Sequence, residues 1–114
     1  MPEEGGKVKI YEALAGTGYP VCHPPYQGNE ETYITYQIIG QDSIIYAEGK
    51  EAETTVMFAV NIFSGLFAAS VLSAVKQALE SAGYIVTVEA ENYDKDHKKN
   101  QISLIAEIEG AQYG

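Results

Sequence analysis

The sequence predicts an α+β fold: a mainly antiparallel sheet of four or five strands, with one long helix and one short helix packed on it. Apolar residues alternate with other residues in three stretches, at residues 53–63, 84–91 and 101–109. Apolar residues at helical spacing from 66 to 82 lie between the first two of these stretches. A helix inserted among strands that otherwise follow one another directly is typical of an α+β domain.

The N-terminal region predicts a short helix and then an irregular segment. Residues 7–15 place Val8, Tyr11 and Leu14 three apart, on one apolar helix face. The glycines that follow, between residues 16 and 18, should end this helix. Residues 19–31 are rich in proline, which lacks the backbone donor that helices and strands require, so we expect no regular structure there.

A strand is predicted at residues 32–39, where β-branched and aromatic residues predominate. Residues 40–43 should then form a turn. Residues 44–47 predict a short strand or an extended loop, and a second turn follows at 48–51.

The strand at residues 53–63 has two largely apolar faces. Thr54, Val56, Phe58, Val60 and Ile62 share one face, and the alternate residues share the other. A strand with two apolar faces lies in the centre of a sheet or presents its second face to another subunit.

The C-terminal half predicts a capped helix and a hairpin. Ser64 should cap the helix at 66–82, and Gly83 should end it. The strands at 84–91 and 101–109 should pair, with residues 92–100 forming a long polar tip between them.

The composition of the chain limits the functions that it can have. The 114 residues suit one domain, for which we expect flexible tails at 1–6 and 110–114. Sixteen acidic residues against seven lysines, with no arginine, give a net charge of −9. This balance argues against specific nucleic-acid binding and against anionic lipid surfaces. With no signal peptide and no long apolar run in the sequence, we expect no membrane and a cytoplasmic site of synthesis.

Two groups of residues could carry chemistry, and in both a simpler interpretation is preferred. Cys22 and His23 are adjacent, but neighbours in an extended chain point to opposite sides, and nothing nearby orients the imidazole. Asp94, Asp96 and His97 resemble a metal site but lie among lysines, which favours a solvated loop. We therefore expect no catalytic residues, no metal and no cofactor.

Protein contacts are the favoured use of the surface. An apolar triplet between two polar turns needs a partner, and so does the second face of the central strand. The basic residues of the last hairpin could meet an acidic neighbouring copy. The candidate interface residues are Ile44, Ile45, Tyr46, Met57, Phe63, Lys95, His97, Lys98 and Lys99.

The order of these elements resembles a family. Gly18-Tyr-Pro-Val, the proline-rich bend and Tyr33-Ile-Thr-Tyr-Gln resemble the opening of bacteriophage tail-completion proteins, also called tail-to-head joining or tail-terminator proteins. The alternating strand, the helix, and a hairpin that contains Tyr93-Asp94 continue the resemblance over about residues 7–109. One departure is Thr32, where the family has a proline.

The resemblance implies a structural subunit, without catalysis or cofactor, that forms a ring, usually a hexamer. Such a ring completes the tail and contacts the tail tube and the head connector of a virion assembled in the bacterial cytoplasm. Two alternatives remain open: a small regulatory or ligand-binding α+β domain, which needs a concave polar pocket, and a small hydrolase or metal enzyme that uses the two groups described above.

Overall fold

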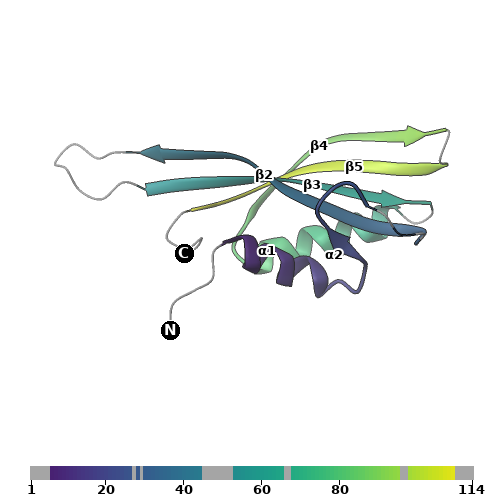
Figure 1. Cartoon of the computed structure of the whole chain (residues 1–114), viewed down its shortest axis with the longest axis horizontal. Helices are drawn as coiled ribbons and strands as arrows, with labels where there is room; N and C mark the ends of the chain where they lie inside the picture. Colours follow the sequence, from purple (N-terminus) through teal and green to yellow (C-terminus); the bar gives the residue numbers. More distant parts are fainter. Residues whose placement is uncertain are drawn as a thin grey trace.

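The computed structural model describes residues 6–26, 28, 30–44, 53–65, 68–95 and 98–109. These residues form one five-stranded sheet with two helices on one of its faces (Figure 1). The strands lie in the order β1-β2-β3-β5-β4, and every pairing except β1 with β2 is antiparallel. The α+β prediction is confirmed. In chain order the elements are α1 (Gly6–Ala15), β1 (Val21–Cys22), β2 (Thr32–Ile44), β3 (Glu53–Ser64), α2 (Ala68–Ser81), β4 (Ile85–Asp94) and β5 (Lys99–Glu109).

Both helices end as the glycines predict. Gly18, just after α1, has φ 92°, and Gly83, just after α2, has φ 101°. At the end of α2 the Tyr84 amide donates to the Leu79 carbonyl at 3.0 Å, and the Gly83 amide donates to the Glu80 carbonyl at 3.0 Å. This pair of bonds is the Schellman motif, which requires a left-handed residue at the position of Gly83. It also brings Tyr84 into the core beside Leu79, and both are buried.

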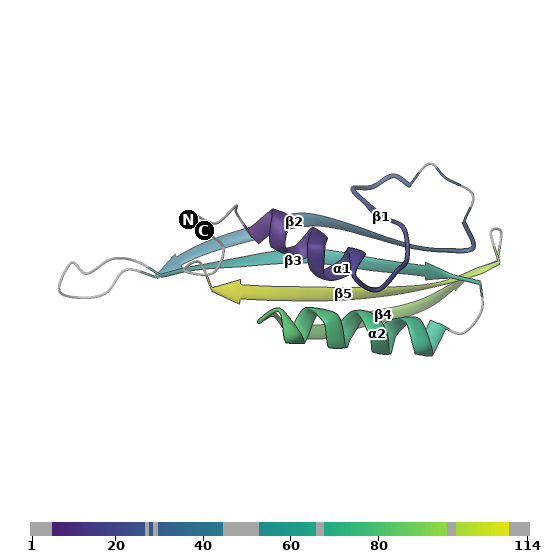
Figure 2. The same cartoon turned by 90° about the horizontal axis from the view of Figure 1, so that it is seen from below.

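The core lies between the sheet and the helices. Figure 2, seen from below, shows the two helices side by side in front of the sheet, with α2 alongside β4 and β5. The predicted inner face of β3 is confirmed, because its apolar side chains are almost fully buried. The helices, the neighbouring strands and the residue just before β4 contribute the remaining large core residues, Ile10, Leu14, Ile34, Tyr36, Val71, Val75, Leu79, Tyr84, Ile102, Leu104 and Ile108.

β2 is longer than predicted. The turn expected at 40–43 is wrong, because β2 continues to Ile44, which pairs with Glu53. A bulge between Ile38 and Gly40 shifts the register and lets the strand run on. Gly40 suits this place because a β-carbon there would lie 3.3 Å from Met57 Cε. The following hairpin turn, predicted at 48–51, lies outside the described residues.

The cap predicted at Ser64 stays a prediction, because it would bond residues 66 and 67, which lie outside the described residues. Ser64 is the last residue of β3, is fully buried, and its hydroxyl lies 3.2 Å from that of Thr32.

One further expectation is wrong: the proline-rich segment contains regular structure, the two-residue strand β1. Pro20 supports it, because its carbonyl accepts a 2.8 Å bond from the Ile34 amide. Proline lacks a donor but keeps its acceptor.

The last hairpin is more regular than predicted. Pairing of β4 with β5 continues to Asp94 and Lys99, so the long polar tip expected at 92–100 is mostly strand. A bulge lies between Val88 and Ala90. Of the predicted site residues here, Lys95 and Lys98 are exposed, whereas Asp96 and His97 lie outside the described residues.

The described part of the chain is elongated, with extents of 54 × 29 × 23 Å. Its radius of gyration is 15.3 Å, compared with about 13 Å for a compact domain of this length. The β2–β3 hairpin accounts for this shape, because it projects beyond both helices (Figure 1). Pairing of β3 with β5 ends at Thr55. Pairing of β3 with β2 continues beyond that point, to Ser43 and Ile44.

Replacing Phe58 by alanine should destabilise the protein by about 3–5 kcal/mol, the usual cost of emptying a buried phenylalanine site. Phe58 is fully buried and makes an edge contact with Tyr84 at 6.1 Å between ring centroids. Urea unfolding followed by circular dichroism measures the change. Gln77→Ala, on the exposed side of α2, should change stability by less than about 0.5 kcal/mol. Equal effects of the two variants would contradict this description of the core.

Candidate interaction surface

The face of the sheet opposite the helices, here named the open face, is the main candidate site. No described helix covers it (Figures 1 and 2). Its side chains are neither core nor fully solvated: Met57, Asn61 and Phe63 of β3, and Ser103 and Ile105 of β5, are all half-buried. Thr35, which pairs with Asn61 on this face, is buried, but the half-buried side chains keep exposed surface that a partner can contact.

An aromatic stack occupies one end of the open face. The Tyr33 ring lies 4.0 Å from that of Tyr26 and 4.8 Å from that of Phe63, with interplanar angles of 14° and 18°. Tyr33 is therefore stacked between the two rings. Such pairs contribute about 0.5–1.5 kcal/mol each beyond burial. The pKa of Tyr33 is raised, first by burial and then by the negative charges that Cys22 and Asp94 carry when ionised.

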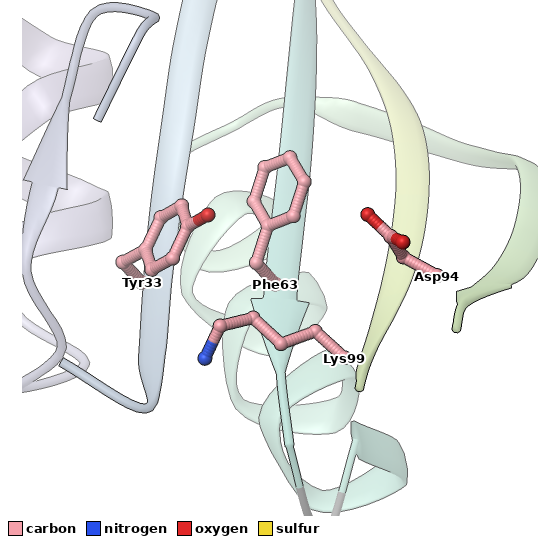
Figure 3. Close-up of a pocket in the computed structure, with 4 residues that line it drawn as sticks. All are labelled: Tyr33, Phe63, Asp94 and Lys99. Carbon is pink, nitrogen blue, oxygen red and sulfur yellow. The ribbon is translucent and has the colours of Figure 1, made fainter. Parts of the chain in front are cut away.

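Lys99 links β5 to Glu31 and Tyr33 at this end of the sheet. Its ammonium donates to the Glu31 carbonyl at 2.9 Å and lies 5.9 Å from the Tyr33 ring centroid, within cation–π range. Figure 3 shows the Lys99 side chain reaching towards Tyr33 while Asp94 approaches Phe63 from β4. These four residues line a hollow of about 170 Å³. Sites for small organic ligands usually measure about 300 Å³ or more, so this hollow does not favour the ligand-binding alternative.

The middle of the open face is polar but uncharged. The Asn61 side-chain carbonyl accepts from the Ser103 hydroxyl at 2.8 Å and from the Gln101 amide at 3.3 Å. The pairing of Asn61 with Ser103, and of Phe63 with Gln101, places these side chains beside one another. Such a network holds the polar groups in fixed positions, which suits contact with another surface.

The open face brings together some of the predicted interface residues. Phe63 and Lys99 meet at the aromatic stack, whereas Met57 lies farther along the same face, next to Gly40. Ile44 ends β2, and Ile45, Tyr46 and His97 lie outside the described residues. The polar network and the place of Tyr26 were not predicted from the sequence. The available signal was the single amide Asn61 in apolar β3 and the polar residues Gln101 and Ser103 at alternate positions of β5.

The described residues do not assemble the candidate enzyme sites. The His23 ring packs on Tyr36, with centroids 4.5 Å apart, and burial raises the pKa of the Cys22 thiol. A raised pKa leaves less of the reactive thiolate at neutral pH. No group of three or more metal-ligating side chains occurs within the described ranges. Neither described helix has the length and apolarity needed to cross a membrane.

Comparison with known proteins gives one informative result. No family model matches the sequence, and no curated protein matches it. Among solved structures, the chain is similar to a chain of the "Virion of native gene transfer agent (GTA) particle". That match has 14% sequence identity and a TM-score of 0.50, and covers 89% of this chain and 92% of the other. At this identity the match shows a shared fold, and it extends over nearly the whole of both chains.

The thiol of Cys22 should react with iodoacetamide more slowly than free cysteine at pH 8. Its folded-state pKa is raised by burial, so a smaller fraction is ionised at a given pH. Mass spectrometry of timed samples measures the rate, and unfolding the protein in urea should restore the rate of a free thiol. A folded protein that reacts faster than free cysteine would instead indicate an activated nucleophile.

Proposed function

We propose that this chain is a structural subunit of a phage-like virion, in which it completes the tail and joins it to the head. The observation that carries the proposal is the shared fold, over nearly the full length, with a chain of the GTA virion particle. The resemblance of the segment around Tyr33 to tail-completion proteins supports the finer role. The two lines of support are of different kinds, since one is a similarity of structure and the other a similarity of short sequence motifs.

The chemistry of the described residues fits a structural subunit that contacts other proteins. The open face combines stacked rings with a fixed amide network, and the hollow beside them is small. Interfaces between proteins are typically built from aromatic residues and satisfied polar groups of this kind. The proposed partners are other copies of the chain, in a ring that is usually a hexamer in the resembling family, together with tail-tube and head-connector proteins.

The acidic surface suits this position in a particle. With a net charge of −9 and no arginine, the chain is poorly suited to binding a phosphate backbone. A subunit beside the path of packaged DNA benefits from that property, because passing DNA would not adhere to it. Assembly is proposed to occur in the bacterial cytoplasm, with the mature subunit located in the particle.

The proposal is tested in the bacterium that encodes the chain. An epitope tag placed after Gly114 should sediment with particles in a density gradient, and gold-labelled antibody should mark the point where head and tail meet. Deletion of the gene should yield separate heads and tails in electron micrographs. A tag confined to soluble fractions, together with normal particles from the deletion strain, would refute the proposed function.

Reversing the hairpin charges should weaken incorporation into particles. Lys95 and Lys98 are exposed basic residues on an acidic molecule, and an acidic neighbouring copy would attract them. The double variant Lys95→Glu/Lys98→Glu should lower the tagged chain in particles severalfold, as measured by quantitative blotting. Lys76→Glu, on the exposed side of α2, reverses one charge away from the hairpin and should leave incorporation unchanged. Equal losses in both would assign the effect to overall charge.

A further inference from the structure

We propose that the free edge of β2 in one copy pairs with the free edge of β4 in the next copy, so that the sheet continues from subunit to subunit. The partner is a second copy of this chain, and the inference rests on the self-association included in the proposed function. It adds the two strands that join, their relative direction and the residues that meet.

Each outer edge of the sheet has a stretch with no described strand beside it. At one edge, β1 covers β2 only at Ile34 and Thr35. The Ile34 amide points outward, since it donates to Pro20. In an antiparallel ladder the outward amides recur at every second residue, so the Tyr36 and Ile38 amides also point outward. The His23 ring packs on the Tyr36 ring, and no described strand lies beside Ile38 at this edge. At the other edge, β5 is the only described strand that pairs with β4. Unpaired edges of this kind are templates for another strand.

Each free edge also carries exposed apolar side chains. On β2, Ile38 is 40% exposed and Ile39 is 48% exposed. On β4, Ile85 is 68% exposed and Val88 is 40% exposed. Large aliphatic residues at both edges are costly in a lone molecule and are covered when the two edges meet.

The pairing registers place the exposed apolar residues of β2 and those of β4 at the same height along the strands. One row runs from Ile38 through Phe58 and Ala106 to Val86. The row beside it runs from Tyr36 through Val60 and Leu104 to Val88. Copies related by rotation about an axis parallel to the strands therefore meet row to row. Ile39 is the extra residue of the β2 bulge; it follows Ile38 just as Ile85 precedes Val86, so the two residues lie beside each other at the junction.

The direction of the strands agrees. β2 is antiparallel to β3, β3 to β5, and β5 to β4, so β2 and β4 run in opposite directions within one copy. A copy added by rotation keeps that relation across the junction and makes an antiparallel pair. The junction joins two different edges, and repetition of such a contact closes into a ring when the rotation permits.

The negative charge of β4 favours the junction of β2 with β4 over a symmetric junction between the β4 strands of two copies. Glu89, Glu91 and Asp94 make the β4 edge acidic, and all three are exposed. Pairing β4 with β4 would bring these carboxylates together, which is unfavourable. β2 has no charged residue from Thr32 to Gln41 and can accept the acidic strand.

Cysteine cross-linking tests the junction. In a Cys22→Ser background, one protein carries Ile39→Cys and a second, with a different tag, carries Ile85→Cys. Residues opposed in an antiparallel pair lie about 5 Å apart at Cα, which suits a disulfide. The two proteins are mixed at high concentration, oxidised with copper phenanthroline, and separated on non-reducing gels. A mixture of Ser73→Cys and Gln77→Cys proteins, both exposed on α2, measures random collision.

The expected result is a mixed dimer severalfold above the helix control, with a ladder of higher products from the double variant Ile39→Cys/Ile85→Cys. Dimers of the Ile39→Cys protein with itself would show a symmetric β2 junction and overturn the proposal. A mixed yield no higher than the control would also overturn it. Incorporation of the chain into particles without this cross-link would refute the junction alone, whereas the cross-link without incorporation would refute the proposed function.

Discussion

The central place of β3 in the sheet is the constraint on which the rest of the molecule depends. β3 pairs with β2 over one edge and with β5 over the other, so its backbone is satisfied along nearly its whole length. Its inner face, with Phe58 at the centre, then has to be buried, and the two helices do this. Because both helices lie on that side, no described helix covers the outer face with Met57 and Phe63. The open face is thus a consequence of how the core is closed.

Much of this fold could be predicted from local pattern. The alternation in β3, the helical spacing of Val71, Val75 and Leu79, and the glycine that ends α2 each depend on neighbours within one turn or one strand. The failures share a different cause. Gly40 continues β2 because it pairs with Met57, and Val21 and Cys22 form a strand because they pair with Ile34 and Thr35. In both cases a partner distant in sequence overrides the usual preference of the residue.

The candidate surface was predictable only in part for the same reason. Phe63 and Lys99 could each be predicted from the sequence as interface residues, Phe63 because it lies on the second apolar face of its strand and Lys99 because it is basic. Their convergence on Tyr33, and the arrival of Tyr26 on its other side, depend on strand order. The matching rows of the two sheet edges likewise follow from three registers that no local pattern reveals. Long-range pairing therefore supplies the features most relevant to assembly.

The central claim is that surfaces left uncovered by this chain are covered by other subunits in a particle. Hydrogen–deuterium exchange, compared between the free protein and purified particles, tests it most directly, because amide protection reports which backbone groups become paired. The account predicts new protection along β4 and around Ile38 of β2, with little change in the already paired β3. Unchanged exchange along both edge strands in the particles would contradict it.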